Sequence, residues 1–286
     1  MQSSSKNIQD NLYKISSIIH DSENLNIIFE KLSNVIYESI GIKNFYVALL
    51  NRELDLITFP FYTDIKDHAP KQKFSSGRGM TNYAIKKNMK ILINKGEYEQ
   101  LIQNGEVDAI GTAPYYWLGV PLKDFKQTVI GLIAIQTYDK NIKINEDHIQ
   151  LINFISEQLT LAIDRFHHIK ELEHLTYYDP LTELPNKSLF FEEGNNIINN
   201  RNDNYMIACL FIDIDNFMVI NDTHGDYISN NIIQKISYNL ASIKTKKLKA
   251  YYWGADKFTI IIKDCKDIAD ITKLSEIIKK AIRSDI

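Results

Sequence analysis

A single apolar repeat in the middle of the chain limits the folds that are open to it. Between residues 147 and 176, apolar side chains recur in steps of three and four, at positions 152, 155, 159, 162, 166, 169 and 172. Such steps place the apolar residues on one stripe of a long α-helix. A stripe of this length is typical of helices that pair in a parallel coiled coil, so we predict a linker helix that forms a homodimer. A compatible alternative is that the first half of the helix packs on the sheet of its own domain.

The chain of 286 residues exceeds what one compact core usually holds, and the helix separates a first domain, 1–165, from a second, 177–286. Hydrophobic residues make up 44% and charged residues 24% of the chain, as in ordinary soluble proteins. The net charge of -3 gives no case for nucleic acid as a partner. We find no signal peptide, no apolar run long enough to span a membrane and no disulfide framework, so we expect a cytoplasmic protein.

Both domains alternate helical and strand patterns, which indicates a mixed α and β fold. In the first domain we predict a helix over 22–41, a hairpin over 44–63, a short helix over 79–88, a strand over 89–93 and a second hairpin over 116–138. In the second we predict a buried strand over 205–215 that contains Cys209, a helix over 227–243, a hairpin around 251–260 and a final helix over 271–282. The first pattern favours an antiparallel sheet with helices, and the second an antiparallel or mixed sheet covered by helices.

Three stretches of the second domain match one family in order and spacing. They are "DPLTELPNKSLF" (179–190), "FIDIDNFMVINDTHGDYISNN" (211–231) and "WGADKF" (253–258). They resemble the signature blocks of the GGDEF family of diguanylate cyclases, which implies a nucleotide-cyclase-like, palm-type fold and a reaction that joins two GTP molecules into cyclic di-GMP with the help of Mg²⁺. The resemblance implies Asp213, the Ile214 carbonyl and Asp256 as metal ligands. It implies a nucleotide site at Phe217, Asn221, Asn230, Gly254 and Ala255.

Six positions in these blocks depart from the family pattern. The family glutamate that serves the metal and the attacking hydroxyl is Lys257, and a protonated lysine can hold no magnesium. The other five replacements are Ala255 for glycine, Met218 for lysine, Asn230 for aspartate, Ser229 for glycine and Asp226 for histidine. The family motif for product inhibition is also absent at Thr245 and Leu248. We therefore expect no catalytic residue here, and a GGDEF domain that acts as a relay or as a GTP-binding regulator.

Three alternatives stay open at this point. The family's domain normally continues beyond the equivalent of Ile286, so we expect either an incomplete domain or part of a longer protein, for example one with an EAL phosphodiesterase domain downstream. An active diguanylate cyclase with unusual site residues is the second alternative. A dimerisation scaffold without a ligand in either domain is the third.

Two stretches of the first domain resemble GAF domains, the sensory modules that often precede signalling outputs. They are "FSSGRGMTNYAIKKNMKILI" (74–93) and "GTAPYYWLGVPLKDFKQTVIGLIAIQTYD" (111–139). GAF pockets hold various small molecules or none, and the absence of cysteine in this half argues against a bilin. Tyr62, Tyr115, Tyr116 and Trp117 are candidates for the pocket lining, although aromatic side chains here are more often part of core or rim packing. The resemblance leaves the identity of the ligand open.

Overall fold

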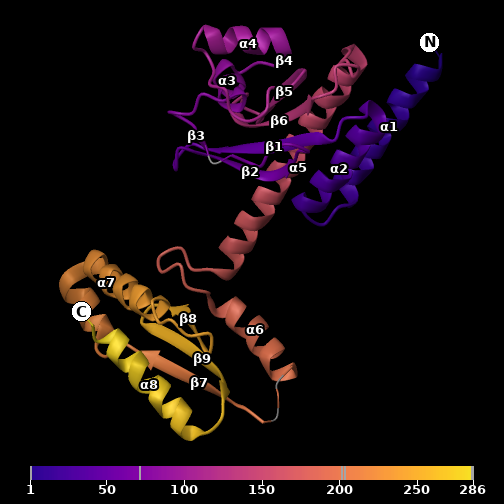
Figure 1. Ribbon diagram of the computed structural model, residues 1–286. Helices are drawn as coiled ribbons and strands as arrows, with labels where there is room; N and C mark the ends of the chain where they lie inside the picture. The colour runs from indigo at the N-terminus through magenta and orange to yellow at the C-terminus, as the bar shows by residue number, and fades with distance from the viewer. Residues whose placement is uncertain (1, 71, 201, 203, 285–286) are drawn as a thin grey trace. The chain divides into compact units, whose positions relative to one another are not determined.

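The computed structural model describes residues 2–70, 72–200, 202 and 204–284, and the chain divides into two compact units, Met1–His168 and Ile169–Ile286 (Figure 1). Helix α5 (Glu146–Tyr177) crosses the boundary between them as one continuous helix. The long helix predicted from the apolar repeat is therefore present. No helix in the described ranges combines the length and the apolar character needed to cross a lipid bilayer.

The first unit is built on one antiparallel sheet in the order β3-β2-β1-β6-β5-β4. Its strands are β1 (Asn44–Asn51), β2 (Leu56–Thr63), β3 (Gln72–Lys73), β4 (Ile91–Asn94), β5 (Tyr116–Lys123) and β6 (Val129–Thr137). Both predicted hairpins are confirmed, since β1 pairs with β2 and β5 pairs with β6. The sheet joins the two hairpins through the pairing of β1 with β6.

Helices cover both faces of this sheet (Figure 1). Successive side chains of a strand point to opposite faces, so Phe45 and Val47 of β1 enter one core while Tyr46 and Ala48 enter the other. The first core also contains residues of α1 (Gln2–Asp21), α2 (Leu25–Ile40) and the first half of α5. The second core contains residues of α3 (Met80–Lys87) and α4 (Lys95–Gln103). Strands buried on both faces explain their nearly continuous apolar sequences.

Local signals set the helix ends of the first unit. The Asn24 side chain accepts a hydrogen bond from the backbone N–H of Ile27 at 3.1 Å, and Gly41 ends α2 with a φ of 79°. These are the caps that Asn and Gly favour, and they confirm the helix predicted over 22–41. Helices α1 and α4 are absent from the sequence-based prediction, although Asn94 and Glu97 form a capping box at the start of α4.

The apolar stripe of α5 is buried along the first half of the helix and exposed along the second half. Ile152, Ile155 and Leu159 are fully buried in the first core, and the hydroxyl of Ser156 donates to the carbonyl oxygen of Pro121 at 3.0 Å. The interpretation that the first half packs on its own domain is thus confirmed. Further along, Ile169 and Leu172 are 42% and 63% exposed, so the second half of the stripe faces solvent.

The second unit has a three-stranded antiparallel sheet in the order β7-β9-β8. Its elements are α6 (Lys187–Asn199), β7 (Met206–Asp213), α7 (Phe217–Ala241), β8 (Leu248–Gly254), β9 (Lys257–Cys265) and α8 (Ile268–Ile282). Residues of α7 and α8 share a core with Tyr252, Phe258 and Ile260 of the sheet. On the opposite side, Phe190 of α6 meets the ring of Tyr251 with centroids 5.3 Å apart.

Two predictions for this unit need correction. Strand β7 is the edge strand, and its side chains alternate between exposed and half-buried, so the prediction of a buried strand is wrong. Cys209 is accordingly exposed, and Phe211 is 71% exposed. Helix α7 begins ten residues before the predicted start at 227, at Phe217, because the first part of the helix precedes a break at Gly225, where φ is 77°.

The block at residues 179–190 has a structural role. The Asp179 carboxylate accepts hydrogen bonds from the backbone N–H groups of Leu181 and Thr182 at 3.1 and 2.9 Å, which closes the turn that follows α5. Asn186 then caps α6, and Pro185 accepts a hydrogen bond from the N–H of Tyr252 at 2.8 Å. This loop therefore anchors the start of the domain to β8, next to the turn that carries the candidate site.

Candidate functional site

The end of β7 and the turn between β8 and β9 bring the predicted metal ligands together. Asp213, the last residue of β7, lies opposite Lys257, the first residue of β9. The backbone N–H of Ile214 donates to the carbonyl oxygen of Asp256 at 3.2 Å, which ties the strand end to the turn. The Ile214 carbonyl accepts from the N–H of Phe217 at 3.2 Å, where α7 begins. Two chain segments far apart in sequence thus meet at one point.

The turn itself uses a backbone conformation that suits glycine. Gly254 has a φ of 105° and Ala255 has a φ of 53°, so both lie in the left-handed region. The hydroxyl of Tyr252 donates to the carbonyl oxygen of Ala255 at 2.9 Å and holds the turn in place. An alanine in this conformation is strained by roughly 1 kcal/mol relative to glycine. The replacement of the second glycine of the signature is therefore tolerated at a small loss of stability.

The Asp213 and Asp256 carboxylates and the Lys257 ammonium group lie together at this point, and the Asp215 carboxylate adds a further negative charge. Desolvation, a hydrogen bond with Asp256 and repulsion by the Asp256 carboxylate raise the pKa of Asp213 above its usual value, while Lys257 opposes this shift. The Lys257 ammonium lies 4.0 Å from an Asp256 carboxylate oxygen. The Lys257 side chain is 62% exposed and that of Asp256 is 25% exposed, so the lysine is the outer member of the pair.

These groups make an incomplete site for Mg²⁺. A hard cation of this kind takes six oxygen ligands, usually carboxylates together with waters and substrate phosphates. Within the described residues, no three His, Cys, Asp or Glu side chains gather closely enough to hold a metal ion. Asp213 and Asp256 supply two carboxylates, and the position where a third acid would complete the set carries the cationic Lys257. The residues present therefore do not fit the catalytic ion of a cyclase.

The predicted nucleotide-contacting residues follow α7. Phe217 is its first residue and packs partly into the domain core, and Asn221 follows one turn later. The side-chain oxygen of Asn221 is buried and has no hydrogen-bond partner among the described residues. Asn230 is exposed and lies beyond the break at Gly225. Asn221 thus retains a buried acceptor without a protein partner in the described part of the chain.

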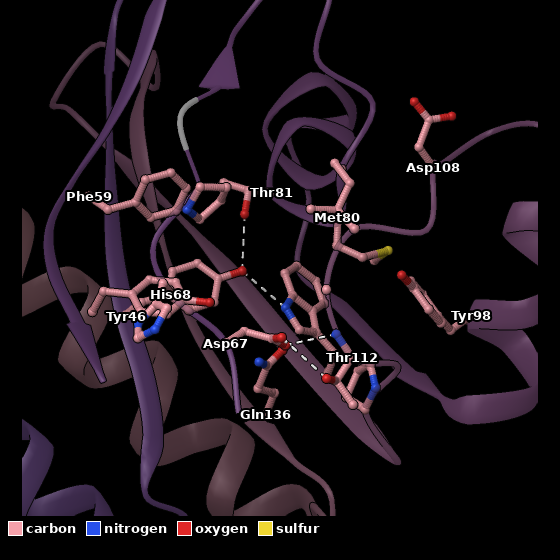
Figure 2. A pocket seen from close by; sticks show the side chains of 17 residues that line it. Tyr46, Phe59, Asp67, His68, Met80, Thr81, Tyr98, Asp108, Thr112 and Gln136 are labelled. Carbon is pink, nitrogen blue, oxygen red and sulfur yellow. Dashed lines mark hydrogen bonds between the residues drawn. The ribbon is translucent and has the colours of Figure 1, made fainter. Parts of the chain in front are cut away.

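The first unit contains a pocket of about 170 Å³ on the face of the sheet that carries α3 and α4 (Figure 2). The indole N–H of Trp117 donates to the Tyr46 hydroxyl at 3.1 Å, and this hydroxyl lies 3.0 Å from that of Thr81. The Asp67 carboxylate accepts hydrogen bonds from the backbone N–H and the hydroxyl of Thr112 at 2.8 and 3.2 Å. Strands thus supply the aromatic floor, and loops supply the polar side.

Only part of the predicted aromatic set lies in this pocket. Tyr62 and Trp117 line it, whereas Tyr115 lines a separate surface groove and Tyr116 packs against the other core. The polar residues Asp67, Thr112 and Gln136 also line the pocket and escaped the sequence-based prediction. Asp67 and Thr112 lie in loops that meet only in the folded chain, so the sequence offers no local signal for them. By contrast, the alternation of side chains along a strand is a signal in the sequence that assigns Trp117 to the opposite face of the sheet from Tyr116.

The two units together define a class of protein: a GAF-like sheet with its pocket, joined through one long helix to a nucleotide-cyclase-like domain. The chain belongs to the GAF domain family, whose model matches residues 22–164, and it carries a diguanylate cyclase GGDEF domain, whose model matches residues 176–284. Both resemblances seen in the sequence are therefore confirmed.

The chain is similar to known proteins in its individual domains. Diguanylate cyclase DgcN of Escherichia coli is 32% identical over 104 residues, which are 36% of this chain and 26% of that protein. The GAF domain of an Acinetobacter phosphoenolpyruvate-protein phosphotransferase aligns with a TM-score of 0.47 and 15% identity, over 56% of this chain and 95% of that one. The GGDEF domain of Caulobacter crescentus DgcB, in complex with c-di-GMP, aligns with a TM-score of 0.33 and 24% identity, over 36% of this chain and 58% of that one. The chain thus spans about a quarter of the length of DgcN.

Proposed function

We propose that this chain is a cytoplasmic signalling protein of the cyclic di-GMP type, in which the GAF domain senses a small molecule and the GGDEF domain works without cyclase activity. The GGDEF domain then serves as a relay or as a GTP-binding regulator. The domain order and the similarity to diguanylate cyclases support the signalling role. The observation that carries the loss of activity is Lys257, whose ammonium group lies 4.0 Å from Asp256 in the signature turn.

The chemistry of phosphoryl transfer explains why this lysine is decisive. Joining two GTP molecules depends mainly on positioning and on neutralising the charge that develops on the phosphates. In cyclases of this type the bound metal supplies that neutralisation, and carboxylates hold it. Lys257 removes one carboxylate and adds a positive charge at the same point, which repels a divalent cation. The unused acceptor of Asn221 is the feature that favours residual GTP binding over a bare scaffold.

The proposed loss of activity is tested by incubating the full chain with GTP and either Mg²⁺ or Mn²⁺ and measuring cyclic di-GMP by mass spectrometry. We expect no product above the level of a protein-free control. Calorimetry with GTP is expected to give measurable binding in the wild type and weaker binding in Asp213→Ala. Steady turnover would contradict the proposal, and the absence of GTP binding in the wild type would leave only a scaffold role.

We further propose that the second half of α5 forms a homodimer. Ile169, Leu172 and Leu175 are exposed on a helix whose earlier stripe positions, such as Ile152, Ile155 and Leu159, are buried in the first unit. Exposed leucines that continue an apolar stripe are typical of a helix that pairs with a second copy. A paired helix also gives a physical route by which one domain affects another, since α5 passes from the first unit into the second.

Replacing Leu172 by glutamate is expected to shift the chain from dimer to monomer. The change places a charge in the exposed second half of the apolar stripe, where two copies would lie close together and repel. Size-exclusion chromatography with light scattering measures the mass directly. Leu54→Glu is the matched control, because Leu54 is 71% exposed in the turn between β1 and β2 and lies outside the stripe. A wild-type chain that is monomeric at high concentration would contradict the dimer.

A further inference from the structure

The pocket of the first unit has no lysine or arginine side chain among its 17 lining residues. Phosphate recognition in proteins relies on those side chains or on helix N-termini, and here the N-terminus of α3, at Gly79 and Met80, is the backbone group of this kind in the lining, with His68 as its one imidazole. Two basic side chains close in sequence to lining residues already have partners, and one of these partners, Asp108, belongs to the lining. Lys66 lies over the Tyr138 ring at 4.4 Å, and Arg78 pairs with Asp108 at 3.1 Å. A nucleotide or another phosphorylated ligand therefore finds no basic side chain in this lining to neutralise its charge.

The polar side of the pocket is acidic. Asp67 accepts two hydrogen bonds from Thr112 and one from the Tyr138 hydroxyl, at 3.0 Å. A carboxylate offers about four lone-pair positions, so one acceptor position of Asp67 is available to a ligand. Gly111 packs against this carboxylate, since a Cβ there would lie 2.8 Å from its oxygen. Asp64 adds a second negative charge behind the pocket, where it accepts from Gln136 at 2.6 Å.

The apolar side of the pocket is aromatic. Tyr46 and Tyr62 stack with centroids 5.3 Å apart, and Phe59 meets them edge-on at 5.7 and 5.8 Å. The faces of such rings carry negative electrostatic potential and attract cations. Burial, together with the charge of Asp64, raises the pKa of Tyr46 to about 12 despite hydrogen bonds from its neighbours, and the same influences raise that of Tyr62. A negative charge is thus disfavoured here, and the ring faces together with the Asp67 carboxylate are what favour a cation.

We propose that this pocket binds a small organic cation whose ammonium group lies between the Asp67 carboxylate and the aromatic rings. The volume of about 170 Å³ is close to that of a cavity which accepts benzene, so the ligand has about ten heavy atoms or fewer. Carboxylate and π-faces together are the chemistry that recognises ammonium groups in proteins. The inference rests on the proposed sensory role of the GAF domain and gives the chemical class of its input.

The test is calorimetry of the full chain with choline, ethanolamine and trimethylamine. The uncharged isostere of choline, 3,3-dimethylbutan-1-ol, and inorganic phosphate are the matched controls. We expect at least one of the three amines to bind about tenfold or more tightly than the isostere, because only the cation gains from the carboxylate and the rings. Equal binding of the isostere, tighter binding of phosphate, or no binding of any amine would overturn the proposal.

Variants locate the bound cation. Asp67→Asn removes the charge at nearly constant shape, and Tyr62→Leu removes one ring of the aromatic side. Both are expected to weaken amine binding about tenfold. Asp124→Asn is the control, since Asp124 accepts backbone hydrogen bonds in an exposed turn of the same unit, outside the pocket. Unchanged binding in both pocket variants, with wild-type far-ultraviolet circular dichroism, would contradict this placement.

The outcome is separable from that of the proposed function. Amine binding tests the pocket of the first unit, whereas GTP binding and cyclic di-GMP formation test the second unit. An amine that binds without altering GTP affinity supports the ligand class and contradicts coupling between the domains. GTP binding without amine binding contradicts the ligand class and leaves the proposed GTP-binding role of the second unit standing.

Discussion

Replacing Trp117 by alanine is expected to lower the free energy of unfolding of the first unit by about 3–5 kcal/mol, the range for a large aromatic side chain removed from a core. Trp117 is 2% exposed and is among the largest fully buried side chains in the described part of the chain. Its ring occupies space that Gly119 leaves open, because a Cβ on Gly119 would approach the indole to 2.1 Å. The same change removes the hydrogen bond to the Tyr46 hydroxyl and leaves a cavity beneath the pocket.

Differential scanning calorimetry of the full chain measures this effect, because two compact units are expected to give two transitions. Trp117→Ala should lower only the transition of the first unit. Trp253→Phe is the control in the second unit, where Trp253 contacts the rings of Phe190 and Phe211. A first-unit transition that stays within 1 °C of the wild type would contradict the packing role of Trp117.

Replacing Lys257 by glutamate is expected to raise the affinity for Mg²⁺ or Mn²⁺ by about ten- to a hundredfold. The change removes the ammonium group beside Asp256 and supplies a third carboxylate oxygen donor at the strand end opposite Asp213. Solvent screens part of the gain, since the Lys257 side chain is 62% exposed. The variant thus separates the loss of the metal site from the five other departures in the signature blocks.

Titration with Mn²⁺, followed by electron paramagnetic resonance, gives the affinities of the wild type and the variant. Lys263→Glu is the matched control, because it makes the same charge change on the same strand, six residues away from the turn. If both variants bind the ion equally well, general surface charge rather than the signature turn controls the affinity. In that case the structural explanation for the proposed loss of catalysis would be wrong.

Much of the fold follows from local signals in the sequence. Asn24 and Gly41 define the ends of α2, and the two hairpins of the first unit appear as paired β-rich runs. Helix α1 and strand β7 were not predicted correctly for different reasons. Helix α1 was missed because its first residues are polar and its helical periodicity is weak there. The position of β7 was wrong because an apolar run has the same sequence pattern in a central strand as in an edge strand. Edge position depends on pairing between distant strands, which no local pattern encodes.

The candidate sites show the same limit. Asp213 and Asp256 were predicted as neighbours because the signature blocks of the family carry that information, and the register of β7 with β9 brings the two segments together. In the first unit the candidate aromatic residues included Tyr116 and Trp117, which are adjacent on one strand and therefore face opposite sides of the sheet. Applying strand alternation would have separated them. Asp67 depends on loop geometry that the sequence does not encode locally.

A single strand, β5, separates the pocket from the long helix α5. Trp117 borders the pocket, whereas its neighbour Leu118 belongs to the core that contains Ile152 of α5. The carbonyl oxygen of Pro121, on the same strand, accepts the hydrogen bond of Ser156. A displacement of the pocket wall therefore reaches α5 through a stiff, close-packed element, with no loop between them to absorb it. The pocket and the helix are thus separated by the thickness of a single strand.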